Sequence, residues 1–232
     1  MVWGFLFICT YVFAEEQVSY KISPSHYFFT DGGSGNDLNL RAITKDSNYW
    51  VGYYTQSQDG FSQLRVGFDH RHQVLKEQPL FLLPSLQSAS GGFWGGSIGV
   101  EYGEPWFISL SLGRTNLATY WNLNFDPNDS YTLNAGKRFS DSELIMLSHV
   151  HDNRQNPDQS HTHLIWKGKL PNAHHMTFDL LYKQGIIEGN FIRKYGVSME
   201  YDWWHGFLKV AYDPDVNFTS SDLYRVTLGL RF

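Results

Sequence analysis

Apolar and polar residues alternate along the C-terminal stretch of the chain, residues 223–232. Because successive side chains of a strand point to opposite faces, this pattern predicts a β-strand with one face for an apolar environment and one for water. The apolar row ends at the final residue of the sequence. The two rows are Tyr224, Val226, Leu228, Leu230 and Phe232 against Arg225, Thr227, Gly229 and Arg231.

Short segments with the same alternation follow one another along the chain, with turn residues between them. No segment keeps a helical period for more than two turns, so the pattern predicts an all-β meander. A weaker segment at 18–29 is either a first strand or a lead-in, and it raises the expected number of strands from thirteen to fourteen. The thirteen stronger segments are 38–45, 49–56, 61–72, 80–88, 94–103, 106–115, 130–138, 143–152, 160–169, 175–184, 192–202, 205–213 and 223–232.

The two faces of these segments indicate what surrounds them. In segment 106–115 the outward row is Trp106, Ile108, Leu110 and Leu112, and the inward row is Ser109, Ser111, Gly113 and Thr115. Aromatic residues at strand ends, a small or charged second face and alternating short and long connections are typical of transmembrane barrels. We therefore expect an antiparallel up-and-down transmembrane β-barrel of fourteen strands, or twelve if the N-terminal segments do not pair. A soluble β-barrel is the alternative, but its two faces would misplace either apolar or charged residues.

Composition agrees with this prediction. The chain is 17% aromatic and 18% charged with a mean hydropathy of −0.36, and it has no apolar run of the length that a membrane helix needs. We expect residues 1–14 to be a signal peptide, 15–36 an N-terminal segment and first loop, and 37–232 the barrel. The net charge of −5 comes with no basic stripe, so we expect no nucleic-acid partner.

The final strand resembles the C-terminal signal strand of Gram-negative outer-membrane β-barrel proteins, which ends on Phe or Trp. This resemblance rests on patterning over residues 37–232, with no specific characterised family. It implies a multi-pass barrel in the cell outer membrane, contact with outer-membrane lipid, and recognition of the strand ending in Phe232 by the barrel assembly machinery. We expect no cofactor.

Charged residues on the inward rows form the first candidate site. In a channel they would create an electric field that selects solutes, and in a closed barrel they would pair into a polar plug. Both alternatives need charges of both signs. The set is Arg41, Arg65, Asp69, Arg71, Glu101, Lys194, Glu200, Asp202, Lys209, Asp213, Arg225 and Arg231.

A histidine-rich hairpin forms the second candidate site. If Val150 and Leu164 face lipid, then His149, His151, His161 and His163 face the lumen, and pairing His151 with His161 also pairs His149 with His163. Four imidazoles could bind Zn²⁺ or Cu²⁺ or supply a general base; otherwise they are solvated rim residues. The motif resembles the His-x-Ser pair of outer-membrane lipid hydrolases but has His in the position of the nucleophilic Ser, so no catalytic role is carried over.

Three functions remain open from the sequence. The first hypothesis is a narrow channel for small polar solutes. The second is a lipid-active or metal-binding enzyme that uses the histidines, and the third is a structural or adhesive barrel without turnover. The aromatic and amide-rich stretch 120–129 predicts either a sugar-contacting surface or a loop that folds over the rim.

Overall fold

The structure is a computed structural model that describes residues 18–121 and 129–232. The expected signal peptide and most of the stretch 120–129 lie outside the described residues. The strands are β1 (Ser19–Phe29), β2 (Ser34–Ile43), β3 (Ser47–Gln56), β4 (Ser62–His70), β5 (His72–Gln73), β6 (Leu80–Ala89), β7 (Phe93–Tyr102), β8 (Trp106–Thr115), β9 (Ser130–Ser140), β10 (Glu143–Asp152), β11 (Ser160–Lys169), β12 (His175–Ile187), β13 (Asn190–Trp203), β14 (Gly206–Asp213) and β15 (Leu223–Arg231).

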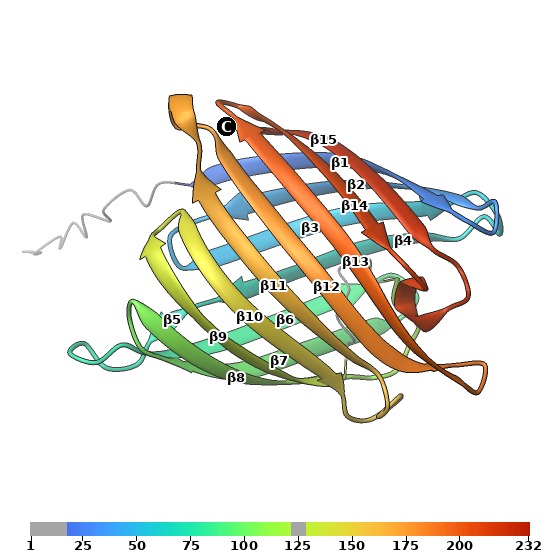
Figure 1. The fold of residues 1–232 in the computed structure, drawn as a ribbon, viewed down its shortest axis with the longest axis horizontal. Coiled ribbons are helices and arrows are strands. Elements are labelled where there is room, and N and C mark those ends of the chain that lie inside the picture. Colours follow the sequence, from blue (N-terminus) through green and yellow to red (C-terminus); the bar gives the residue numbers. More distant parts are fainter. Residues whose placement is uncertain (1–17, 122–128) are drawn as a thin grey trace, which may run out of the picture.

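These strands form one closed antiparallel sheet (Figure 1). Each strand pairs with its neighbours in sequence, β1 pairs with β15, and β4 and β5 follow each other along β6 as one interrupted strand. The prediction of a fourteen-strand, all-β barrel is therefore confirmed for the described part of the chain. In those residues no helix is long and apolar enough to cross a membrane.

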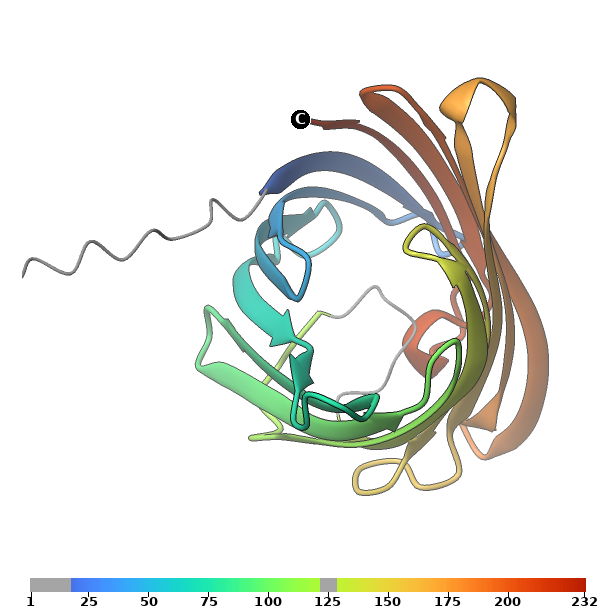
Figure 2. The same cartoon turned by 90° about the vertical axis from the view of Figure 1, so that its left-hand side faces the viewer.

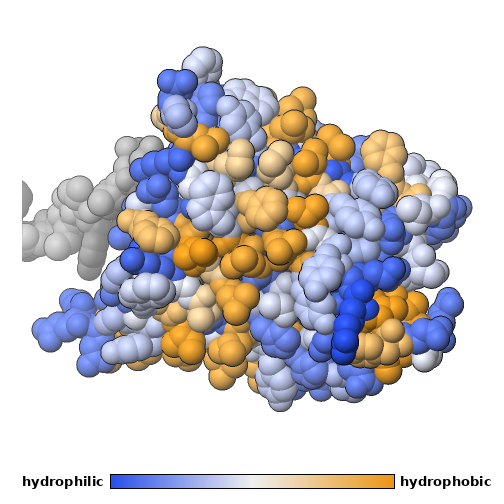
Figure 3. All heavy atoms as spheres, viewed as in Figure 1, coloured by the Kyte–Doolittle hydropathy of each residue, from blue (hydrophilic) through white to orange (hydrophobic). Residues whose placement is uncertain are grey.

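The outer surface of the barrel is apolar and its interior polar, as the alternation predicts. Leu110 on β8 is 60% exposed, whereas Ser109 beside it is 2% exposed and faces inward. Figure 3 shows apolar residues gathered across the middle of one face and polar residues toward the two ends. A surface of this kind buries its apolar area only when lipid surrounds it.

Aromatic pairs lie near both ends of this apolar surface. Tyr182 and Tyr195 have ring centroids 5.2 Å apart at one end, and Tyr20 and Phe232 are 5.8 Å apart at the other. Amphipathic rings are enriched at the level where a membrane meets water. The pairs therefore mark the two edges of the lipid-facing band.

The connections differ in length at the two ends. We call the end with the β8–β9, β10–β11 and β14–β15 connections the loop end, and the end where β1 begins and β15 ends the turn end. The sequence predicts seven connecting residues, 185–191, between the segments 175–184 and 192–202, and this is wrong, because β12 and β13 continue to a two-residue turn at Glu188 and Gly189. Both turn residues have positive φ, 49° and 81°, as a tight hairpin requires.

The weak N-terminal segment is the strand β1, and it completes the barrel. β1 pairs with β2 on one side and β15 on the other, and the backbone amide of Phe232 donates to the carbonyl oxygen of Tyr20 at 3.0 Å. Pro24 lies inside this strand although proline lacks a donor. That interruption made the segment hard to classify from sequence.

Candidate functional site

The candidate site is the lumen of the barrel. A cavity of about 930 Å³ extends from the turn end, at Ile43, Ser142 and Trp204, up to Arg65 and Tyr120. A second cavity of about 460 Å³ adjoins it at Asp69 and Ser85. Charged residues of both signs line the larger cavity.

Most of the charged residues chosen from sequence line this larger cavity: Arg41, Arg65, Asp69, Glu200, Asp202, Lys209, Arg225 and Arg231. The other four form ion pairs elsewhere: Arg71 with Glu101, Asp213 with Lys183, and Lys194, which is exposed, with Asp215. Sequence reasoning missed Lys21, Asp37, Lys167 and Asp179 of the lining. Strand alternation predicts Lys167 and Asp179 on the inward rows, whereas Lys21 and Asp37 belong to segments whose strand pairing was uncertain.

The densest ion-pair network lies near the turn end. Arg231 donates from Nη2 to Glu200 and from Nε to Asp202, each at 2.6 Å, and Lys21 Nζ donates to Glu200 at 3.0 Å. These four residues come from β1, β13 and β15. The network thus connects β1, β13 and β15 where the first and last strands pair and close the barrel.

A second network crosses from the β4–β5 junction to β9. Glu101 on β7 is 4% exposed and accepts hydrogen bonds from Arg71 at 2.9 and 3.1 Å and from Arg138 at 2.8 Å. The two guanidinium groups also lie over the rings of Phe81 and Phe107. We interpret these three residues as a structural ion-pair network, in which the two guanidinium groups compensate the charge of the buried Glu101 carboxylate.

The segment 116–121 folds inward from the end of β8 and is held on β4. Gln63 on β4 donates to the carbonyl oxygen of Thr119 at 2.9 Å and accepts from the backbone amide of Trp121 at 3.0 Å. Arg65 on the same strand donates to the carbonyl oxygen of Trp121 at 3.1 Å. The segment therefore narrows the lumen near the loop end, at the upper limit of the cavity.

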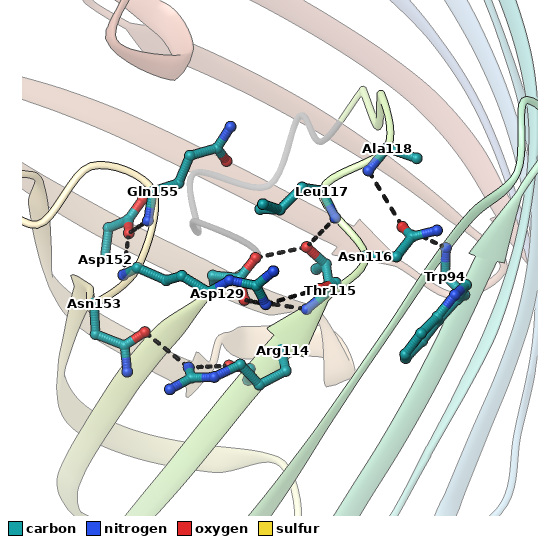
Figure 4. Close-up of polar contacts among 12 residues, drawn as sticks. Trp94, Arg114, Thr115, Asn116, Leu117, Ala118, Asp129, Asp152, Asn153 and Gln155 are labelled. Carbon is teal, nitrogen blue, oxygen red and sulfur yellow. Dashed lines mark hydrogen bonds and ion pairs between the residues drawn. The ribbon is translucent and has the colours of Figure 1, made fainter.

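A buried polar network fixes the base of this inward-folded segment (Figure 4). Asp129 accepts from the backbone amide and hydroxyl of Thr115 at 3.1 and 2.6 Å, and Arg154 donates to the same carboxylate at 3.0 Å. Leu117 then donates its amide to the Thr115 hydroxyl at 3.1 Å. The ends of β8, β9 and β10 are thus locked to one another where the segment leaves the wall.

The connection between β14 and β15 also folds inside the ring of strands (Figure 2). Val216, in the short 3₁₀ turn Val216–Phe218, packs in a buried cluster with Tyr27, Phe29, Tyr54 and Leu223. Phe61 and Trp121 pack against the same cluster. The loop end of the lumen is therefore filled in part by aromatic side chains, whereas the turn end keeps the open cavity.

The two described aromatic residues of the stretch 120–129 are both engaged in packing. Tyr120 stacks on Phe93 with centroids 4.1 Å apart, and Trp121 stacks on Tyr54 at 5.6 Å. Burial raises the pKa of the Tyr120 hydroxyl, which stays a neutral donor to Gln87 at 3.2 Å. The sugar-contacting surface stays a prediction, since most of that stretch lies outside the described residues.

The four histidines do not share one patch, and the predicted pairing is wrong by one residue. Val150 is buried in the lumen, so His149 and His151 face outward, opposite Thr162 and Ser160. The aliphatic Ile145 and Leu147 set this parity, because the lipid face of β10 is the face that they occupy. His149 Nδ1 lies 2.9 Å from the Thr162 hydroxyl oxygen on the outer surface.

His161 and His163 do face the lumen. His163 Nδ1 lies 3.0 and 3.2 Å from the carboxylate oxygens of Asp179, and the ring of His161 stacks on Phe218 at 5.1 Å. Within residues 18–121 and 129–232, no group of three or more His, Cys, Asp or Glu is arranged to hold a metal ion. Metal binding by the histidines remains a prediction from sequence, now restricted to pairs of them.

The fold matches those of solved outer-membrane proteins. Omp33 of Acinetobacter baumannii has a TM-score of 0.60 at 6% identity, covering 92% of this chain and 98% of its own. OmpF of Salmonella typhi, in a complex with daunomycin, has a TM-score of 0.51 at 8% identity, with coverages of 93% and 97%. A mutant Rh. blastica porin has a TM-score of 0.50 at 10% identity, with coverages of 93% and 99%.

The chain has the fold of an outer-membrane porin. Its sequence matches no protein-family model and no curated protein. Identities this low relate the porin-like barrel to these proteins by architecture alone. Its function must therefore be inferred from its own lumen.

Proposed function

We propose that the porin-like barrel is a narrow channel for small polar solutes in the outer membrane, with the loop end outside and the turn end toward the periplasm. The observation that carries the proposal is the charged cavity of about 930 Å³ inside a wall whose outer face is apolar. A polar solute crosses the apolar core of a membrane only where protein groups replace the hydrogen bonds of its hydration shell. Charged side chains that line a lumen can form such contacts.

The partly filled loop end explains why the channel would be narrow. A fourteen-strand barrel is wider than the eight-strand forms that side chains fill, so a lumen without inward-folded segments would be more open. Here residues 116–121 and the 3₁₀ turn Val216–Phe218 occupy part of it. The proposal therefore predicts small conductance steps rather than those of a wide general pore.

The test is electrical recording of purified protein in planar bilayers. Heat-modifiable migration on a gel establishes beforehand that the barrel is folded. We expect discrete conductance steps, and Ser198→Trp, which places a large ring at the cavity surface, should reduce them. The matched control is Val197→Trp on the same strand, because Val197 faces outward.

A folded barrel that gives no conductance steps at any voltage would overturn the channel. Equal steps for Ser198→Trp and the wild type would show that the path avoids the cavity. Either result contradicts the proposed route. The Val197→Trp control shows whether a reduction in Ser198→Trp arises at the cavity or from a general effect of adding a tryptophan to β13.

A further inference from the structure

The charge of the larger cavity differs in sign from the charge of the chain. Of the described residues that line it, seven are Lys or Arg and five are Asp or Glu, whereas the whole chain has a net charge of −5. Five of the basic residues lie on adjacent strands, β2, β1, β15 and β14. We call Lys21, Arg41, Lys209, Arg225 and Arg231 the basic wall.

Ion pairs within the lining neutralise most of its acids. Glu200 and Asp202 are held by Lys21 and Arg231, as described above. Asp37 accepts from Arg65 at 2.6 Å, in a pair whose side chains are 11% and 6% exposed. Asp179 faces His163 on the same wall, whose imidazole is a cation only when protonated, so three of the five carboxylates have a Lys or Arg partner and a fourth has a histidine.

Three cations of the lining have no acidic partner among the residues that the structure describes. Among the described residues, Arg41, Lys167 and Lys209 form no ion pair within 4 Å, and Arg41 donates from Nε only to the amide oxygen of Asn39, at 3.0 Å. Among the described acids of the lining, Asp69 alone forms no ion pair, and it accepts a hydrogen bond from the Asn48 side-chain amide at 2.8 Å. Basic charge is therefore in excess where solute would pass.

The position of Lys209 explains its lack of a partner. Its neighbour across the strand pair is Glu200, but that carboxylate is directed to Lys21 and Arg231 instead. On its other side Lys209 lies opposite Thr227, with Arg225 on the diagonal. A lysine flanked by cations gains stabilisation from any anion that enters the cavity.

The cavity is small enough for these charges to act on everything inside it. A sphere of that volume is about 12 Å across, comparable with the Debye length of about 8 Å at physiological ionic strength. Across the lumen, β6, β7 and β8 contribute neutral hydroxyl groups from Ser85, Ser97 and Ser111 to the adjoining cavity. A solute in the lumen thus meets excess positive charge on one side and hydroxyl groups on the other.

We propose that the lumen selects small anions, with carboxylates as its solute class, and that Arg41 and Lys209 are the residues that contact them. A guanidinium binds a carboxylate through paired N–H groups, and serine hydroxyls accept and donate to hydroxyl groups of the same solute. The inference rests on the proposed channel and adds the sign of the charge that it passes. Phosphate shares the oxyanion chemistry, and the experiment distinguishes the two.

The test is the reversal potential of the wild-type channel under a potassium chloride gradient, followed by replacement of chloride with acetate or with phosphate. We expect the sign that indicates anion preference, and a higher permeability for acetate than for phosphate. In the Arg41→Gln, Lys209→Gln double variant the anion-to-cation permeability ratio should fall about fourfold. This is the change expected for two unit charges about 8 Å from the ion in water, acting with opposite sign on anion and cation and screened with a Debye length of about 8 Å.

The matched control also removes two basic charges, through Arg193→Gln and Lys76→Gln. Both residues are exposed and outside the cavity lining, so the ratio should stay at the wild-type value. Steps with a reversal potential at zero or of cation-selective sign would overturn the anion proposal and leave the channel intact. A preference for phosphate over acetate would overturn the carboxylate assignment, whereas absence of steps would reject the proposed channel itself.

Discussion

Replacing Gln63 by alanine should release the inward-folded segment 116–121 from the wall. The side-chain amide of Gln63 makes three hydrogen bonds: to the carbonyl oxygens of Thr119 at 2.9 Å and Ser90 at 3.2 Å, and from the amide of Trp121 at 3.0 Å. Two of them hold the segment itself. Alanine removes the whole clamp while leaving β4 in place, because its backbone pairing with β3 and β6 does not depend on the side chain.

The magnitude follows from the hydrogen bonds lost. The two that hold the segment contribute roughly 0.5–1.5 kcal/mol each, net of the water that replaces them, so the held position should lose about 1–3 kcal/mol, roughly a 5- to 150-fold shift toward displaced positions. Contacts of Arg65 with Trp121 and of Tyr120 with Phe93 remain. We therefore expect a segment that leaves the wall more often, and not one that is lost from it.

Single-channel recording measures this directly. The Gln63→Ala channel should show a higher mean conductance and more open-channel noise than the wild type. Gln78→Ala is the control, since Gln78 lies in the exposed turn before β6 and only its backbone forms hydrogen bonds. Unchanged conductance and noise in a correctly folded Gln63→Ala barrel would show that residues 116–121 do not narrow the path.

Three further substitutions test the wall. Leu110→Lys should reduce the free energy of unfolding in lipid vesicles by about 2–4 kcal/mol, because Leu110 faces the hydrocarbon. The control Leu75→Lys, in a turn, should change it by less than about 0.5 kcal/mol, and equal losses in urea titrations would contradict the lipid-facing assignment. Glu101→Gln should cost about 3–5 kcal/mol in the same titration because it leaves two guanidinium groups without their carboxylate, and a loss below about 1 kcal/mol would refute the structural role. Phe232→Ala removes the ring stacked on Tyr20 and should lower the heat-modifiable fraction recovered from membranes, an effect that unaltered recovery would exclude.

Strand alternation was sufficient to predict the barrel because each strand meets two different solvents. On β8, the apolar side chains of Ile108 and Leu110 and the small side chains of Ser109 and Ser111 assign lipid and lumen without knowledge of any neighbour. Residues of the lumen wall could be chosen on the same basis. The lining residues that were missed on β1 and β2, Lys21 and Asp37, lie where Pro24 and the glycines Gly32, Gly33 and Gly35 obscured the strands.

The register between neighbouring strands could not be predicted from alternation, because it depends on the length and type of the turn that connects them. The seven residues 153–159 join β10 to β11 and do not fix which residues face each other, as a two-residue turn would. Asp152 accepts hydrogen bonds from the backbone amides of Arg154 and Gln155 at 3.0 Å each at the start of this connection, and the strands then pair His151 with Ser160 instead of His161. Because Ile145 and Leu147 fix the lipid face of β10, Val150 lies opposite His161 in the lumen, and His149 and His151 face outward.

The hydrogen bonds by which Gln63 holds residues 116–121 could not be predicted from the sequence either. Its partners are 56 and 58 residues away in sequence, and nothing near Gln63 marks it as different from other inward-facing polar residues. An inward polar side chain signals only that water or a folded-in segment faces it. Which of the two applies is decided by the loop, whose carbonyl and amide groups need partners once it leaves solvent.

Two features of the proposed channel lie at different levels along the barrel axis. Near the loop end, hydrogen bonds and aromatic packing through Gln63, Trp121 and the cluster around Tyr54 would set its width. Nearer the turn end, the incompletely paired charges of Arg41 and Lys209 would set its ion preference. Since the two sets share no hydrogen-bond or ion-pair partner among the described residues, changes in one should leave the free energies of the other nearly unaltered. Width and charge preference of the proposed channel should therefore be separable by mutation, and the net negative charge of the whole chain does not predict the sign of the ion that the proposed channel would favour.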